Sequence, residues 1–192
     1  MKRIGITGGI GSGKSVVCRF LHMSGYSVYD SDRQAKMLMD TSPQIKAGLV
    51  EEFGSEMYDA GGHLDRARLA GRVFADEAAL KRLNAIVHPA VKADFEKWCR
   101  NKADESAVFM ESAILVEAHF ADAVDEIWLV TAPEETRMAR IMARNGCSRE
   151  EAVSRIRAQM PDVEKEKFSS RIITNSDEKP IIPQILSALA TL

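Results

Sequence analysis

The chain has 192 residues, a length that suits one compact domain or one domain with a sizeable insertion. Apolar residues make up 45% and charged residues 28%, which excludes a wholly disordered chain. The 26 basic and 28 acidic side chains give a net charge of −2, whereas a dedicated nucleic-acid-binding protein usually carries a basic excess.

Neither the apolar runs nor the cysteines indicate a membrane or a secreted protein. The longest apolar runs, such as residues 113–116, are far too short to span a bilayer, and the N-terminus shows no signal-peptide pattern. Cys18, Cys99 and Cys147 are widely spaced and odd in number, so they indicate neither a disulfide framework nor a zinc site. We therefore expect a cytoplasmic monomer or small homo-oligomer with no membrane and no nucleic-acid partner.

The first 40 residues predict a strand, a glycine-rich turn, a helix, a second strand and another helix. Residues 3–7 form a short apolar segment, which predicts the first strand. An apolar helix face follows within residues 16–21. Residues 27–29 form the next predicted strand, and residues 31–39 the next helix. Because parallel strands need a crossover connection, this strand–helix–strand unit implies a parallel sheet.

The stretch from about residue 43 to residue 98 contains no convincing strand. Apolar side chains recur every three or four residues over 80–98, which predicts helix, and Pro89 should divide this run into two helices or kink it. Residues 59–62, Asp-Ala-Gly-Gly, predict a turn. The stretch is therefore interpreted as a helical insertion between the second and third strands.

Three later segments are short, apolar and rich in branched or aromatic residues, as sheet strands are. They are residues 107–110, 126–130 and 171–174. Two short, exposed, arginine-rich helices are expected before the last of them. The first spans about residues 133–146, and the second opens with the capping-box spacing of Ser148 and Glu151.

Residues 8–15, Gly-Gly-Ile-Gly-Ser-Gly-Lys-Ser, match the phosphate-binding pattern G-x-x-x-x-G-K-[ST] in full. Glycines let the backbone curl so that several N–H groups point at one phosphate, and the following helix presents its positive end to the same anion. Lys14 supplies a charge toward the β- and γ-phosphates, and Ser15 a hydroxyl ligand for Mg²⁺. A glycine-rich turn with a surface lysine is the alternative, but a predicted strand before the motif and an amphipathic helix after it favour nucleotide binding. The residues assigned to the nucleotide here are Gly8, Gly9, Gly11, Ser12, Gly13, Lys14, Ser15 and Val16.

Asp30 and Asp32 follow the second strand, at the sheet edge where open α/β sheets bind ligands. Asp32 is the candidate for accepting the proton of an acceptor hydroxyl and orienting it. Strong base catalysis is not essential when the transition state is loose. The alternative is that either carboxylate caps the next helix, and Asp30 suits that role better.

Arg137, Arg140 and Arg144 are spaced three and four residues apart, so they share one helix face. Such a face suits a lid that excludes water and surrounds the transferring phosphoryl group with cations. The alternative is a solvated basic face paired with nearby glutamates. We assign Arg140 to phosphate contact, with Arg144 behind it. The predicted fold is α/β, a three-layer parallel-sheet P-loop NTPase of the nucleotide-kinase type with a helical insertion and a helical lid.

The length and the insertion suit an ATP-dependent small-molecule kinase. Residues 174–177, Thr-Asn-Ser-Asp, lack the lysine of the guanine-reading Asn-Lys-x-Asp, which counts against a G protein. Two alternatives stay open at this point: another acceptor, as in a nucleoside monophosphate kinase, and a nucleotide-dependent switch or binding module with no acceptor. The choice of acceptor distinguishes a dephospho-CoA kinase from a nucleoside monophosphate kinase. A nucleotide switch would instead show ATP hydrolysis that no acceptor changes.

Taken together, these segments resemble the dephospho-CoA kinase family over nearly the whole chain. The phosphate loop is shared with many kinases, but an Asp-x-Asp segment combined with Leu-Asn…His-Pro is much more specific. Beyond the loop, the matching segments are residues 28–32 (Val-Tyr-Asp-Ser-Asp), 64–66 (Leu-Asp-Arg), 83–89 (Leu-Asn-Ala-Ile-Val-His-Pro), 115–117 (Leu-Val-Glu) and 172–175 (Ile-Ile-Thr-Asn). Val16 and Ala113 depart from the family pattern, which often has Thr and Pro at these positions.

The resemblance implies phosphorylation of the ribose 3′-hydroxyl of dephospho-CoA, with ATP as donor and Mg²⁺ as cofactor, to give coenzyme A. It implies one domain over residues 1–192, with its core at about 1–42, 99–136 and 161–192. A helical acceptor-binding region then spans about 43–98, and a lid spans about 137–160.

The resemblance also implies roles for single residues. It makes Asp32 the catalytic acidic residue, acting with Lys14 and Arg140, and it places Asn175 and Arg144 at the nucleotide. The residues assigned to dephospho-CoA are Asp32, Arg66, His88, Leu115 and Glu117.

Overall fold

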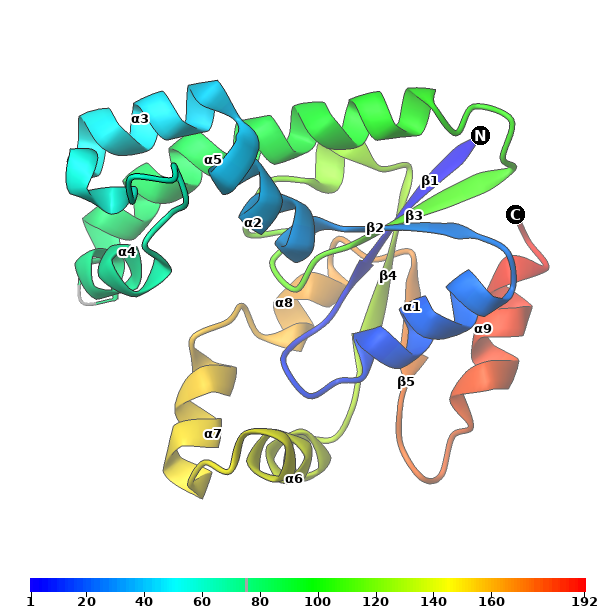
Figure 1. The fold of residues 1–192 in the computed structure, drawn as a ribbon. Helices are drawn as coiled ribbons and strands as arrows, with labels where there is room; N and C mark the ends of the chain where they lie inside the picture. Colours follow the sequence, from blue (N-terminus) through cyan, green and yellow to red (C-terminus); the bar gives the residue numbers. More distant parts are fainter. Residues whose placement is uncertain (75) are drawn as a thin grey trace. The chain divides into compact units, whose positions relative to one another are not determined.

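The computed structural model of the chain describes residues 1–74 and 76–192, which form two compact units (Figure 1). The larger unit comprises Met1–Asp30 and Asn101–Leu192, and the helical unit comprises Ser31–Arg100. The helical unit thus also contains residues 31–42, which the sequence assigns to the core.

The larger unit is built on a parallel sheet whose five described strands lie in the order β2-β3-β1-β4-β5 (Figure 1). Every neighbouring pair is parallel, so the carboxyl ends of the strands meet at one edge, where ligands bind in such sheets. Each predicted strand is present, and the α/β class is confirmed. The strands are β1 (Lys2–Thr7), β2 (Ser27–Asp30), β3 (Ala107–Glu111), β4 (Glu126–Thr131) and β5 (Arg171–Thr174).

The core of this unit lies between the sheet and two helices, α1 (Lys14–Met23) and α9 (Ile181–Leu189), which pack side by side (Figure 1). The central strands are apolar on both faces, as expected for parallel strands that are covered on both sides. Burying each large apolar side chain contributes about 1.5–3 kcal/mol. The buried cluster includes Ile4, Ile6, Val17, Leu21, Phe109, Trp128, Ile173 and Ile185.

Two helices follow β4 and pack against each other through Met138, Ile141 and Ala152 (Figure 1). We call α6 (Glu134–Asn145) and α7 (Arg149–Arg157) together the α6–α7 hairpin. The predicted capping box of α7 is confirmed, since the Glu151 N–H donates to the Ser148 hydroxyl and the Ser148 N–H donates to the Glu151 carboxylate. The prediction that both helices are exposed is wrong for one face of α6. Apolar side chains on that face recur at helical spacing and are buried together with Arg137.

The helical unit confirms the prediction of helix over residues 43–98. Its described helices are α2 (Ser31–Thr41), α3 (Pro43–Phe53), α4 (Arg66–Val73) and α5 (Glu77–Arg100). Short 3₁₀ turns occur at Ser55–Met57 here, and at Ala121–Ala123 in the larger unit, where the short helix α8 (Asp162–Glu166) also lies. The predicted turn at residues 59–62 is present and connects the bridged pair Tyr58 and Leu64.

Of the two outcomes expected at Pro89, division of the run at 80–98 into two helices is wrong, because α5 continues through this proline, and a kink stays a prediction. A proline inside a helix costs about 3 kcal/mol, since one hydrogen bond is lost and its ring crowds the preceding turn. Val87, Val91 and Phe95 are buried along the same helix, and together their burial outweighs that cost. Within residues 1–74 and 76–192, no helix combines the length and the apolar character needed to cross a membrane.

Candidate active site

The phosphate loop, residues 8–15, begins at the carboxyl end of β1 and leads directly into α1. The Ser12 N–H donates to the Gly9 carbonyl at 3.1 Å and closes the turn. Gly11 and Gly13 have φ angles of 80° and 99°, in the left-handed region that favours glycine. The Val16 and Val17 N–H groups both donate to the Gly13 carbonyl, at 2.9 and 3.4 Å, so α1 begins at the loop and its positive end lies there.

Side chains from outside the loop bind three of its consecutive carbonyl groups. Arg137 Nε donates to the Ile10 carbonyl at 3.0 Å and Arg140 Nη1 to the Gly11 carbonyl at 3.3 Å. Asn175 Nδ2 donates to the Ser12 carbonyl at 2.9 Å. In a planar trans peptide the N–H points opposite to the C=O, so the N–H groups that follow Ile10 and Ser12 point away from these side chains. This orientation is the one that anion binding requires.

The loop glycines are required for space as well as for conformation. A Cβ added at Gly9 would overlap the Arg137 guanidinium, and one added at Gly13 would overlap the Asn175 amide. At Gly8 it would overlap a backbone carbonyl of β4. The loop therefore fits closely against these groups, and at Gly8 and Gly13 this agrees with the glycines that the pattern specifies.

The donors and hydroxyls of the loop fit a triphosphate with its cation. Lys14 Nζ donates to the Gly8 carbonyl at 2.7 Å, which holds the ammonium group over the loop. The Ser12 hydroxyl is fully buried without a hydrogen-bond partner, a state that costs about 1–3 kcal/mol and that an arriving oxygen acceptor would relieve. No group of three or more acidic, His or Cys side chains that could hold a metal occurs in the described parts of the chain. Ser15 is exposed at the start of α1, and its role as a ligand of Mg²⁺ stays a prediction.

The structure brings Arg140 and Asn175 together at the loop and leaves Arg144 apart. Arg140 Nη2 donates to the Asn175 side-chain oxygen at 3.4 Å, so both residues support the same turn. Arg144 is exposed, and its Nε donates to the Asn145 side chain at 3.1 Å. Contacts of these residues with nucleotide stay predictions.

From the sequence, Arg137 is placed on the arginine face of the lid but is not assigned to the site. It is 7% exposed, and besides the Ile10 carbonyl it pairs with Asp162 at 3.2 Å. The signal in the sequence is its spacing, because Arg137 lies four residues before Ile141 on the buried stripe of α6. An arginine on such a stripe must have partners inside the fold.

Leu115 and Glu117, both assigned to substrate, lie inside the larger unit. The Leu115 side chain is fully buried and packs closely against Gly5. Glu117 pairs with the fully buried Lys165 at 2.9 Å. Lys165 also donates to the backbone carbonyl of Ala113 at 2.6 Å. This bond to the segment at residue 113 does not depend on the side chain at that position. Any contact of Leu115 or Glu117 with substrate stays a prediction.

The other residues assigned to substrate lie in the helical unit. Asp32 is exposed in the first turn of α2. Arg66 Nη2 donates to the carbonyl of Lys36 at 3.0 Å and pairs with Asp40 at 2.5 Å. His88 is half-buried on α5. Their roles also stay predictions.

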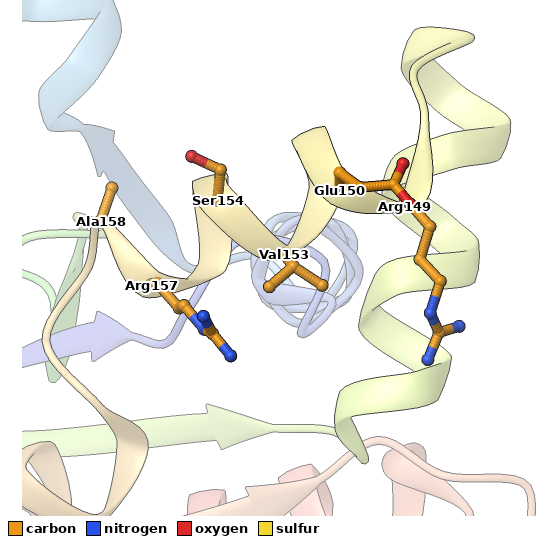
Figure 2. A pocket seen from close by; sticks show the side chains of 6 residues that line it. All are labelled: Arg149, Glu150, Val153, Ser154, Arg157 and Ala158. Carbon is orange, nitrogen blue, oxygen red and sulfur yellow. The ribbon is translucent and has the colours of Figure 1, made fainter.

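An open pocket of about 660 Å³ lies along α7 (Figure 2). Figure 2 shows Val153 and Arg157 extending from α7, while Arg149, at its first residue, pairs with Glu135 at 2.6 Å. The hydrogen bond from Arg149 and its positive charge lower the pKa of Glu135, and the same bond and the negative charge of Glu135 raise the pKa of Arg149. None of the predicted site residues lines this pocket, so it is a feature of the hairpin distinct from the phosphate loop.

A parallel sheet with a phosphate loop after its first strand, and arginines from a helical hairpin on that loop, define a P-loop kinase fold. A family sequence profile described as dephospho-CoA kinase matches residues 2–180. The chain belongs to the dephospho-CoA kinase family.

Individual relatives agree with this assignment. A dephospho-CoA kinase of Bacteroides fragilis is 45% identical over 190 residues, covering 99% of this chain and 92% of its own. The crystal structure of the Thermus thermophilus protein TT1252 is 37% identical with a TM-score of 0.85, covering 99% and 96% of the two chains. A dephospho-CoA kinase structure from Campylobacter jejuni shares the fold, with a TM-score of 0.70 at 22% identity and coverage of 100% and 96%. The protein is thus an ATP-dependent transferase, and the alternatives of another acceptor or a nucleotide switch are not favoured.

Proposed function

We propose that the protein transfers the γ-phosphoryl group of ATP to the ribose 3′-hydroxyl of dephospho-CoA, giving coenzyme A and ADP. The observation that carries this proposal is a complete phosphate loop, with its carbonyl groups bound from outside, in a chain that matches the dephospho-CoA kinase family over residues 2–180.

The loop binds the donor through its backbone and through Lys14. Lys14 Nζ lies over the loop, where it donates to the Gly8 carbonyl at 2.7 Å, and in this proposal its positive charge acts on the β- and γ-phosphates. We place Mg²⁺ on the Ser15 hydroxyl, where the cation would neutralise phosphate charge. Arg140 lies beside the loop and stabilises the charge that spreads over the transferring group.

In this proposal residues of the helical unit bind the acceptor. The lid at about residues 137–160 excludes water from the reaction. Asp32, two residues after the end of β2, accepts a hydrogen bond from the 3′-hydroxyl and orients it toward the donor. Arg66 and His88 contribute to the binding of dephospho-CoA. None of the three cysteines forms a disulfide, which agrees with a location in the reducing cytoplasm.

A panel of acceptors tests the proposed reaction. Purified protein with ATP and Mg²⁺ is given dephospho-CoA, AMP, CMP or shikimate, and ADP release is measured together with the mass of each product. We expect dephospho-CoA to be phosphorylated at least 100-fold faster than the others, a margin of about 2.7 kcal/mol. Equal rates with AMP or CMP would contradict the proposal.

The role of Asp32 is tested by Asp32→Asn, with Asp30→Asn as its matched control two residues away. Asparagine keeps the size of the side chain but is a poorer acceptor, so turnover should fall about 10²-fold or more. The affinity for ATP should change less than threefold. Near-normal turnover of Asp32→Asn, or an equal loss in Asp30→Asn, would remove Asp32 from the mechanism.

A further inference from the structure

Ile10, at the tip of the phosphate loop, is bound through both of its backbone polar groups by the α6–α7 hairpin. Its N–H donates to Gln159 Oε1 at 2.6 Å, and its carbonyl accepts from Arg137 Nε at 3.0 Å. Arg137 lies in the first turn of α6, and Gln159 follows the last residue of α7 by two positions. Both ends of the hairpin therefore meet on a single loop residue.

The side chain of Ile10 also belongs to the hairpin. It packs against the small apolar core that joins the two helices, which is formed around Met138, Ile141 and Ala152. The phosphate-binding pattern leaves this position free, since it specifies only Gly8, Gly13 and the two residues that follow. The isoleucine is thus explained by its contact with the hairpin and not by the phosphate.

Both ends of the hairpin are fixed in turn by buried charge pairs. Arg137 Nη1 pairs with Asp162 at 3.2 Å. Next to Gln159, the Met160 N–H donates to Glu117 Oε1 at 3.2 Å, and this carboxylate pairs with Lys165. Arg137 and Lys165 are buried and their partners Asp162 and Glu117 are only 19% and 24% exposed, so these bonds hold the hairpin ends more firmly than fully exposed pairs would.

We infer that Gln159 and Arg137 are positioning residues, which hold Ile10 so that the phosphate loop is set for ATP before ATP arrives. This inference rests on the proposed function and adds to it a physical link between the hairpin and the loop. The Arg137-bound carbonyl fixes the plane of the peptide between residues 10 and 11, so the Gly11 N–H is directed away from Arg137. Without the bonds from Gln159 and Arg137, the loop becomes ordered only when ATP binds. The entropic cost of that ordering lowers the affinity for ATP.

The test compares Gln159→Met with Gln184→Met, by calorimetric titration with ATP and Mg²⁺ in the absence of dephospho-CoA. Methionine keeps the length of the side chain and removes the amide. Gln184 is the matched control because it also holds a backbone, that of Thr174, through bonds of 2.9 Å, but has no bond to the loop. We expect the dissociation constant for ATP to rise about tenfold in Gln159→Met, or about 1.4 kcal/mol, and less than twofold in Gln184→Met.

Two further readouts separate positioning from a general loss of stability. Exchange of the Ile10 amide hydrogen should be at least tenfold faster in Gln159→Met at unchanged melting temperature, because its acceptor is gone. The KM for ATP should rise while kcat stays within threefold, as expected when binding but not chemistry is affected. Unchanged ATP affinity or unchanged Ile10 exchange in Gln159→Met would overturn the inference.

A second pair of variants serves if Gln159→Met does not fold. Ile10→Ala removes the docked side chain, and Met142→Ala removes a side chain from the same apolar core but outside the loop. Ile10→Ala should weaken ATP binding about tenfold, and Met142→Ala less than threefold; equal effects would overturn the inference. Failure of this inference can be distinguished from failure of the proposed function. The inference is tested by ATP affinity, which is measured without an acceptor, whereas the proposed function is tested by wild-type activity with dephospho-CoA.

Discussion

The ion pairs beside the phosphate loop differ from those of the helical unit in how far they are exposed to water. Around the phosphate loop the ion pairs are shielded, with the Lys165 side chain fully buried against Glu117 and Arg137 buried against Asp162. In the helical unit the arginine of the pair between Arg66 and Asp40 is 44% exposed, and the pairs of α4 and α5 are exposed further.

This difference teaches where the structure is rigid and where it can adapt. Removing one partner of a buried pair leaves a charge that water cannot reach, which costs about 3–5 kcal/mol. An exposed pair contributes only about 0–1 kcal/mol, because water and salt replace the lost partner. The loop that receives the donor is therefore held in one conformation, whereas the surface charges of the helical unit can be rearranged at little cost.

The largest effect should come from breaking a buried pair in the larger unit. Lys165→Met should lower the free energy of unfolding by about 3–5 kcal/mol, because Glu117 loses its partner while one of its oxygens is already unsatisfied. Urea titration followed by circular dichroism measures this change. Lys167→Met is the matched control, since its lysine is exposed and pairs with Glu164, and it should cost less than about 1 kcal/mol. Equal losses in the two variants would remove the contrast between buried and exposed charge.

A slightly smaller effect should follow from removing the loop's own charge. Lys14→Met should reduce turnover about 10²–10³-fold, or about 2.7–4 kcal/mol of barrier, because its ammonium group faces the phosphates in the transition state. Steady-state assay with dephospho-CoA measures the loss. The melting temperature should change little, since the carbonyl groups of Ile10, Gly11 and Ser12 stay bound by side chains other than Lys14. Turnover within tenfold of wild type would exclude this role.

In the helical unit, substitution should separate binding from stability. Arg66→Gln should change the free energy of unfolding by less than about 1 kcal/mol, since the pair with Asp40 is exposed. It should also raise the KM for dephospho-CoA about tenfold, as expected for a lost charged hydrogen bond. Arg72→Gln, which breaks a similar exposed pair with Glu56, is the control and should leave that KM unchanged. If both variants raise the KM equally, Arg66 has no specific part in binding.

The smallest effect concerns the thiols, and it compares two sites within the larger unit. Burial raises the pKa of the Cys18 thiol well above its usual range, and the adjacent Glu111 carboxylate adds to this shift. Cys147 is only partly buried. At pH 8 iodoacetamide should therefore modify Cys147 first, while the Cys18 thiol stays protonated and does not react. Peptide mass spectrometry measures the extent of labelling at each cysteine. Faster labelling of Cys18 would mean that the larger unit opens under native conditions.

Local sequence patterns predict what depends on neighbours along the chain. The strands, the phosphate loop, and the helix ends at Pro133 and Ser148 all follow from short-range composition and spacing. The error at Pro89 has a tertiary cause, since burial of α5 outweighs a local preference. The strand order is likewise set by pairings between distant segments.

The candidate site divides in the same way. Glycines and Lys14 are predictable because backbone geometry demands those residue types at fixed positions. The buried roles of Arg137 and Lys165 are not predictable, because their partners lie far away in the chain, at Asp162 and at Ala113 with Glu117. No periodicity encodes such a pairing.

The account depends most on where the γ-phosphoryl group goes. The measurement is to incubate the protein with ATP labelled in its γ-phosphate, Mg²⁺ and dephospho-CoA, and to locate the label by fragment mass spectrometry. The account predicts labelled coenzyme A with the label on the ribose 3′-phosphate, and no transfer to a 3′-deoxy analogue. Recovery of the label only as inorganic phosphate, or transfer to the 3′-deoxy analogue, would contradict it.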